Sequence, residues 1–416
     1  MSKYLNLSYS AIQGSYWMYY GVIMSFASVF LLAKGYSNSE IGVILASSSI
    51  FAVILQPLLA DIADKSKRIS LIGITGIFSA ILLIVTFTLY IFSSKSPVLA
   101  LIFIFLGGLH MALQPLINSM AFYLTTKERK INFGVARSAG SMAYAILTSI
   151  LGALVVSYGV NAIPTMGILI VILLLVSLWL TRKLYKGALE KNKAITKKVE
   201  NEYKNPNKED GGYRVKTEEH DVINLKDFIL GNKVFILFTF CIVLIFFQNS
   251  VFNNYLMQIL SAVGGDSKEM GRLFSFMAVL ELPGLIFFNR LRERFSCQFM
   301  LKVSSIAFTL KVIFCFMANT VTLIYIGFLF QLISFPIFLS ASVHLVDEVM
   351  KKGEAVKGQS AITAMMTLSA VFASLAGGAI LDFSGPSLLL LISAILAGLG
   401  TLIIVLTVDK IKSHRS

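Results

Sequence analysis

The chain has 416 residues, of which 56% are hydrophobic and 14% are charged, and its mean hydropathy is +0.78. This composition excludes a single soluble core and is typical of membrane proteins with several spans. The net charge of +14 would suggest nucleic acid in a soluble protein. Here lysines and arginines that hold loops on the cytoplasmic side of a bilayer explain it, so no nucleic-acid partner is expected.

Twelve apolar segments are each long enough to cross a bilayer, which takes about 20 residues. They cover approximately residues 9–33, 39–60, 70–92, 98–123, 134–157, 163–181, 232–260, 270–289, 298–317, 320–346, 358–381 and 386–408. We therefore expect an all-α membrane protein with twelve transmembrane helices.

A charged segment divides these spans into two groups of six. Residues 182–226 contain twelve Lys or Arg and eight Asp or Glu, together with turn-forming Asn-Pro and Gly-Gly pairs, which predicts a soluble linker. The expected domains are an N-terminal six-helix half, residues 1–181, and a C-terminal six-helix half, residues 227–416. Many secondary transporters use such a duplicated architecture, with the site near the midplane between the halves.

The positive charges predict the orientation. The loops after the second, fourth, eighth and tenth spans contain twelve Lys and Arg, against three in the loops on the other side. The richly basic side is expected to be cytoplasmic, and both termini and the linker lie on that side. We expect a monomer in the cytoplasmic membrane, with the lipid bilayer as its surroundings.

Arg137 is the first of three charges inside apolar segments, and Tyr144 follows it by seven residues, or two helical turns, so the two side chains share a face. An arginine keeps its charge in a membrane and normally points into a bundle or a water-filled cavity. The alternative is that Arg137, near the start of its segment, extends to the cytoplasmic headgroups.

Glu281 and Lys311 are the other two deep charges. Glu281 lies eleven residues into its segment, about 16 Å along a helix and so near the midplane. A carboxyl group at that depth can carry a proton, because burial and neighbouring cations oppose each other in setting its protonation. The alternative is a static ion pair with Arg137 or Lys311 that only holds the halves together.

Nothing in the sequence indicates an enzyme or a cofactor. The three cysteines lack metal-ligand spacing, and we find no His-Glu-x-x-His zinc motif, nucleophile elbow or phosphate-binding loop. We therefore expect no catalytic residues, no metal and no cofactor.

Residues 56–65, 133–137 and 280–283 resemble motifs of the major facilitator superfamily. Within that superfamily the chain is most similar to the oligosaccharide:proton symporters, the lactose permease-like family, and to their nucleoside- and aromatic-acid-transporting relatives. The resemblance covers nearly the whole chain outside the linker and implies the major facilitator fold. It also implies conformational gating by the motif in the loop between the second and third spans, which comprises Asp64, Lys65 and Arg68.

The resemblance further implies a solute site. Arg137 falls where the family has an arginine that binds sugar hydroxyls, and Tyr144 where it has an aromatic residue that stacks on the sugar. Glu281 matches the family's eighth-helix glutamate, and Lys311 a ninth-helix arginine, which implies roles in proton coupling. Three amides fall on other functional positions of the family and complete the expected substrate-binding set: Asn118, Asn253 and Gln331.

The function expected from these observations is secondary active transport of a small polar solute, such as a sugar, oligosaccharide or nucleoside, by proton-coupled symport and alternating access. One alternative is an exporter or uncoupled facilitator of amphipathic or aromatic compounds. Another is a membrane receptor or enzyme without an identifiable motif. The expected partners are therefore the solute, protons and lipid.

Overall fold

The computed structural model describes residues 2–66, 69–92, 94–125, 131–202, 228, 230–350 and 354–411, with the side chains of 2, 3 and 188–202 left out. Within those ranges the chain forms helices and turns and no strand. The elements are α1 (Ser2–Tyr20), η1 (Gly21–Ser25), α2 (Ala27–Ala33), α3 (Asn38–Lys65), α4 (Leu71–Thr88), α5 (Pro97–Leu124), α6 (Phe133–Tyr158), α7 (Ala162–Glu202), α9 (Lys233–Ser261), α10 (Ser267–Arg292), α11 (Cys297–Met317), α12 (Val321–Phe328), η2 (Leu329–Leu332), α13 (Phe335–Val349), α14 (Ala355–Thr407) and η3 (Val408–Lys410).

Short polar side chains fix where many of these helices begin. At each such start a side-chain oxygen accepts a hydrogen bond from a backbone N–H of the first turn, which satisfies a donor that has no partner within the helix. The capping residues of α3, α4, α5, α6, α10, α11 and α12 are Ser37, Ser70, Ser96, Asn132, Asp266, Ser296 and Thr320. The chain therefore encodes its span boundaries locally.

In the described part of the chain, ten helices are long and apolar enough to cross a membrane, and α1 with η1 and α2 forms a further span bent by 41°. One of the ten is α14, whose 53 residues would extend about 80 Å, far beyond a bilayer of about 30 Å. It turns back at Gly385, where φ is +74°, a value that favours glycine, and Pro386 follows. The ten helices, the bent span and the second half of α14 together make twelve spans, the number predicted.

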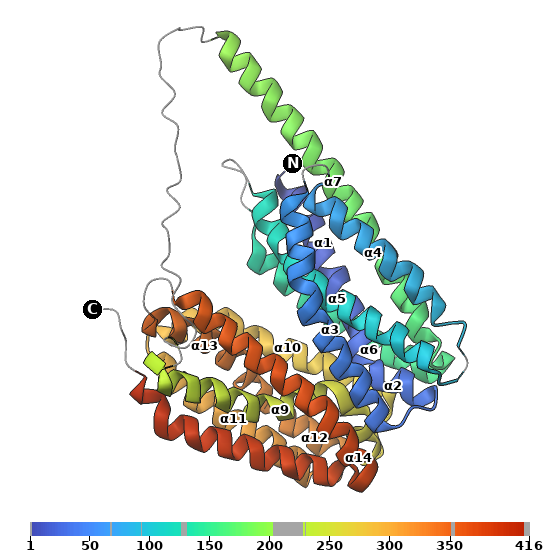
Figure 1. Ribbon diagram of the computed structural model, residues 1–416, viewed down its shortest axis with the longest axis vertical. Helices are drawn as coiled ribbons and strands as arrows, with labels where there is room; N and C mark the ends of the chain where they lie inside the picture. The colour runs from blue at the N-terminus through green and yellow to red at the C-terminus, as the bar shows by residue number, and fades with distance from the viewer. Residues whose placement is uncertain are drawn as a thin grey trace.

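The predicted sixth span ends differently from the expectation. Helix α7 does not stop near residue 181 but continues to Glu202, into the segment predicted as a linker. Figure 1 shows this extension projecting beyond the rest of the bundle. Residues 203–227, the remainder of that segment and the start of the predicted second half, lie outside the described residues.

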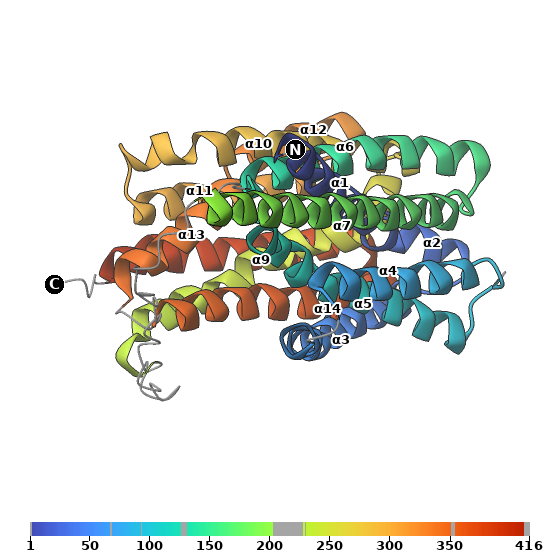
Figure 2. The same cartoon turned by 90° about the horizontal axis from the view of Figure 1, so that it is seen from above.

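The helices form two groups, α1–α7 and α9–α14, which meet at one end and diverge toward the other (Figure 1). Two helix pairs join them: α6 packs against α10, and α3 against α14. Figure 2 shows these pairs along opposite edges of the molecule. Both pairs allow close backbone approach, because a Cβ atom at Gly42 would lie 2.2 Å from the Ser374 carbonyl oxygen, and one at Gly271 only 2.1 Å from that of Thr148.

A polar contact closes the narrow end. The carboxylate of Asp382, in α14, accepts hydrogen bonds from the backbone N–H groups of Asn38 and Ser39 and from the Asn38 side chain, at 2.8–3.0 Å. It thereby caps the N-terminus of α3 in the other group, where an anion is favoured. Gln258 of α9 adds a bond of 2.9 Å to the Asn38 side chain.

Loss of the Asp382 contact should loosen the narrow end. Asp382→Ala removes the acceptor of three hydrogen bonds, which at this exposed position we expect to cost the closed arrangement about 1 kcal/mol. Spin labels at Ser94 and Ser384, exposed on opposite groups, should then show a several-fold larger population at long distance. The three native cysteines are buried and will not compete for the label.

Asp61→Ala is the control, since Asp61 is an exposed carboxylate of α3, the helix that Asp382 caps, and within the described residues pairs only with Lys65 of its own helix. Its distance distribution should equal that of the parent. An unchanged distribution in Asp382→Ala would show that the glycine contacts alone close this end.

Candidate functional site

A cavity of about 240 Å³ lies between the two groups of helices and is lined from both. The first group contributes α1 and α6, and the second contributes α9, α10, η2 and α13. Its lining residues combine aromatic rings, amides and two opposite charges: Trp17, Tyr20, Arg137, Ser141, Tyr144, Asn249, Asn253, Phe274, Met277, Ala278, Glu281, Gln331 and Phe335. Four of the five predicted substrate-binding residues and one predicted proton-coupling residue therefore line one cavity.

Arg137 enters this cavity from α6. Its guanidinium group lies 3.8 Å from the centre of the Trp17 ring and donates a hydrogen bond of 3.0 Å to the Ser141 hydroxyl one turn along the same helix. Such stacking stabilises a cation where water is scarce. No carboxylate of the described residues lies within 4 Å of it, so the remaining N–H donors are available to the cavity.

Tyr144 lies on the same face of α6, as predicted from the spacing. Its hydroxyl group lies 2.8 Å from that of Ser25, and its ring is 6.5 Å from that of Phe274 in an edge-on arrangement. Ser25 belongs to the π-helical turn η1, which widens the backbone between α1 and α2. This bond holds the Tyr144 ring at the cavity, next to the Tyr20 ring, whose centre lies 6.4 Å away.

Glu281 is connected to Lys311 by an amide. The Gln331 side chain donates a hydrogen bond of 2.8 Å to a carboxylate oxygen of Glu281 and accepts one of 2.9 Å from the Lys311 ammonium group. Lys311 is fully buried behind the cavity, where three phenylalanine rings surround it at 5.1–5.5 Å: Phe252, Phe308 and Phe328. Within the described residues no direct ion pair joins Glu281 to either cation.

The predicted amides separate into two groups. Asn253 lines the cavity, four residues and one helical turn from Asn249, so both side chains lie on one face of α9. Asn118 does not line it. The Asn118 side chain instead accepts a hydrogen bond of 3.1 Å from Gln13, within the first group of helices.

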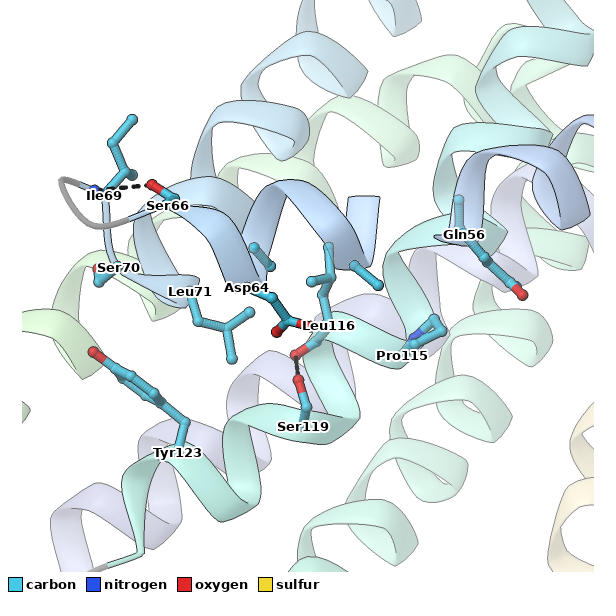
Figure 3. Close-up of a pocket in the computed structure, with 13 residues that line it drawn as sticks. Gln56, Asp64, Ser66, Ile69, Ser70, Leu71, Pro115, Leu116, Ser119 and Tyr123 are labelled. Atoms are coloured by element: carbon cyan, nitrogen blue, oxygen red, sulfur yellow. Dashed lines mark hydrogen bonds between the residues drawn. The ribbon is translucent and has the colours of Figure 1, made fainter. Parts of the chain in front are cut away.

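The predicted gating residues lie in another place. Asp64 lines a separate cavity of about 700 Å³ between α3, α4 and α5, and Figure 3 shows its carboxyl group directed toward α5 near Leu116 and Ser119. Lys65 pairs with Asp61 at 2.8 Å on the surface. Arg68 lies outside the described residues.

Sequence reasoning missed the aromatic contribution of α1. Trp17 and Tyr20 lie in a run of four aromatic residues among residues 16–20, a density that could have drawn attention to this helix. Ser25 carried no signal, because a serine in an apolar span usually bonds its own helix, and only the π-helical turn brings it to Tyr144.

Comparisons with known proteins bear on the whole chain. The model of the MFS_1-like family matches residues 9–391. Among solved structures, the nucleoside transporter NupG is similar with a TM-score of 0.75 and 14% identity, covering 98% of this chain and 99% of that one. A bacterial homologue of the human lysosomal transporter Spinster, in an inward-facing and occupied conformation, is similar with a TM-score of 0.66 and 12% identity, covering 100% of this chain and 99% of that one.

An auto-inhibited peptide transporter of the POT family is also similar, with a TM-score of 0.70 and 11% identity over 99% of this chain and 97% of that one. A search of curated proteins found no significant match. At these identities the structural likeness establishes the fold, and the family match extends over most of the residues that form it. The chain belongs to the MFS_1-like family and is a multi-pass membrane transporter of the major facilitator type.

Proposed function

We propose that the protein moves a small polar solute across the cytoplasmic membrane by proton-coupled symport and alternating access. The two halves, residues 1–181 and 227–416, would rock about the central cavity, connected by the segment 182–226. The observation that carries this proposal is the cavity shared by both halves, in which Glu281 and Arg137 are present without pairing. A site built from two bodies changes whenever they move, as alternating access requires.

The size of the cavity supports a small solute. Its volume of about 240 Å³ is below the roughly 300–1,000 Å³ of pockets for drug-sized ligands. A solute with one ring, such as a monosaccharide or a compact aromatic compound, suits it better than an oligosaccharide. The aromatic rings that line the cavity offer faces for stacking, and the amides of Asn249 and Asn253 offer hydrogen bonds.

Glu281 is the proposed proton carrier. Its carboxyl group faces the cavity and also accepts a hydrogen bond from the Gln331 side chain, which in turn accepts one from Lys311. The fixed donor favours the ionised carboxylate, whereas burial favours the protonated form, so occupancy of the cavity can decide between them. Asp64, Lys65 and Arg68 are proposed to gate the cytoplasmic side of the transporter.

Arg137→Lys should abolish solute binding without preventing folding. Lysine keeps the charge but cannot stack on Trp17 as a plane while donating two parallel hydrogen bonds. We expect at least a tenfold weaker affinity for any solute that binds the parent, measured by calorimetry on purified protein with a melting curve alongside. Equal affinity of the variant would assign Arg137 a purely structural role.

Glu281→Gln should separate coupling from movement. The amide oxygen of the new side chain can still accept a hydrogen bond from Gln331, so this contact persists, but the amide cannot exchange a proton as the carboxyl group does. In proteoliposomes, accumulation driven by a pH gradient should vanish and solute exchange across the membrane should survive.

The static ion-pair interpretation expects a different result for the same variant. On that interpretation Glu281→Gln leaves buried cations uncompensated, at a cost of about 3–5 kcal/mol, so solute exchange and the melting temperature would fall together. That combined loss would exclude Glu281 as carrier, and unchanged gradient-driven uptake would locate coupling elsewhere.

The proposed topology puts both termini and residues 182–226 in the cytoplasm. A single cysteine introduced at Gly211 should therefore resist a membrane-impermeant reagent in intact cells and react after permeabilisation. Exposed Ser384, which the proposed topology puts on the extracellular side, is the control site that should react in intact cells. The reverse pattern would invert the orientation.

A further inference from the structure

The fixed charges in and behind the central cavity do not balance. Arg137 and Lys311 are cations, and Glu281 is the one acidic side chain of the described residues that lines the cavity or contacts either of them. With Glu281 ionised the site therefore has a net charge of +1, and with Glu281 protonated it has +2. A surplus charge at membrane depth is costly unless something compensates it.

The hydrogen bonds show which cation lacks compensation. An ammonium group only donates, so Lys311 must face the amide oxygen of Gln331, and the amide nitrogen then faces Glu281. Lys311 and Glu281 are thus connected through one side chain of fixed orientation. Arg137 is left with a serine hydroxyl and the face of Trp17, neither of which carries a negative charge.

The polar groups around Arg137 are mainly donors. Arginine has five N–H groups, and one of them is used for Ser141. The indole Nε1–H of Trp17 is buried and has no partner in the described residues. That donor has no accessible surface and so does not face the cavity, which leaves the remaining N–H groups of Arg137 as the donors that a ligand with acceptor atoms would satisfy. A planar oxyanion supplies the largest number, and a guanidinium group binds one through two parallel hydrogen bonds.

We propose that the solute is a monoanion: a single-ring compound with one carboxylate, which Arg137 binds beside the aromatic rings of Trp17, Tyr20 and Tyr144 that line the cavity. This proposal rests on the proposed transport function and specifies its substrate class. Bound to the carrier with Glu281 ionised, such a solute brings the site from +1 to zero. A neutral sugar or nucleoside leaves the surplus charge in place.

The charge count also fixes the electrical character of transport. An anion and a proton taken together leave the site at +1, the same charge as the empty carrier, so the complete cycle moves no net charge. A neutral solute taken with a proton moves one positive charge in each cycle. Coupling to the pH gradient alone, without a response to membrane potential, is therefore the signature of the anionic solute.

Matched pairs of probes test the substrate class on purified protein. Benzoate and nicotinate are compared with benzamide and nicotinamide, which have the same rings without the charge, and with uridine and glucose as neutral hydroxyl-rich solutes. At least one carboxylate should raise the melting temperature, and its amide should bind about tenfold more weakly or not at all. A larger shift from an amide, uridine or glucose overturns the proposal, as does the absence of a shift with both carboxylates.

Lys311→Met tests the charge balance itself, with Lys311→Arg as control. Methionine can fill the space between the phenylalanine rings but leaves a site that is already neutral with Glu281 ionised. The preference for carboxylate over amide should fall about tenfold or more in Lys311→Met and persist in Lys311→Arg. If Lys311→Met melts like the parent and keeps the full preference, the surplus charge does not select the solute.

Uptake of the carboxylate that binds, measured in proteoliposomes, distinguishes the two levels of the proposal. A pH gradient should drive accumulation, and a potassium diffusion potential of either sign should not change it. Binding of the carboxylate without any movement would refute the proposed transport function while leaving the anion site intact. Movement driven by the potential, or preferred movement of a neutral probe, would refute the anionic solute while leaving transport intact.

Discussion

Two cations and one carboxylate in an apolar bundle impose the main constraint on this structure. A charge at membrane depth must be compensated by a partner, by aromatic faces or by water. Lys311 has three phenylalanine rings and an amide, and Arg137 has an indole face and a hydroxyl group. Neither cation pairs directly with Glu281 in the described residues. A direct pair would be stable and inert, whereas this separated arrangement leaves charge available to a ligand.

The contacts between the two groups of helices match this role. The most extensive are those of two helix pairs on opposite edges, α6 with α10 and α3 with α14. The closest approaches involve glycines against backbone, where contact is tight but little side-chain surface becomes exposed when the helices separate. Asp382 adds hydrogen bonds whose strength depends on an exposed carboxylate. Such an interface can hold one arrangement and still release it, which a transporter requires.

Much of the fold follows from the sequence, because spans and caps are local features. Apolar length predicts where each span lies, and residues such as Ser37 and Asn132 begin helices through bonds to their own first turn. The end of α7 could not be predicted in this way. Charged residues beyond position 181 resemble a loop by composition, yet a helix that has already formed can propagate into the following residues, with one hydrogen bond for each residue added.

The candidate site was partly predictable for the same reason. Charges inside apolar segments stand out, so Arg137, Glu281 and Lys311 could be selected without a structure. The connection through Gln331 could not, because it joins side chains of three different helical segments. Asn118 shows the limit of matching positions to a family: its side chain is bonded to Gln13 rather than lining the cavity. Polar residues in spans bond to neighbouring helices more often than to a ligand.

The residues that sequence alone could not place occur where helices depart from regular geometry. Ser25 lies in the π-helical turn η1, and Gln331 lies in the 3₁₀ segment η2 between α12 and α13. A regular helix directs each side chain by its position in the 3.6-residue repeat, and an inserted or tightened turn shifts that direction. Ser25 can thereby reach Tyr144, and Gln331 can lie between Glu281 and Lys311. Irregular turns often mark hinges, so the same segments that complete the cavity are suited to changing its shape in the proposed movement of the halves.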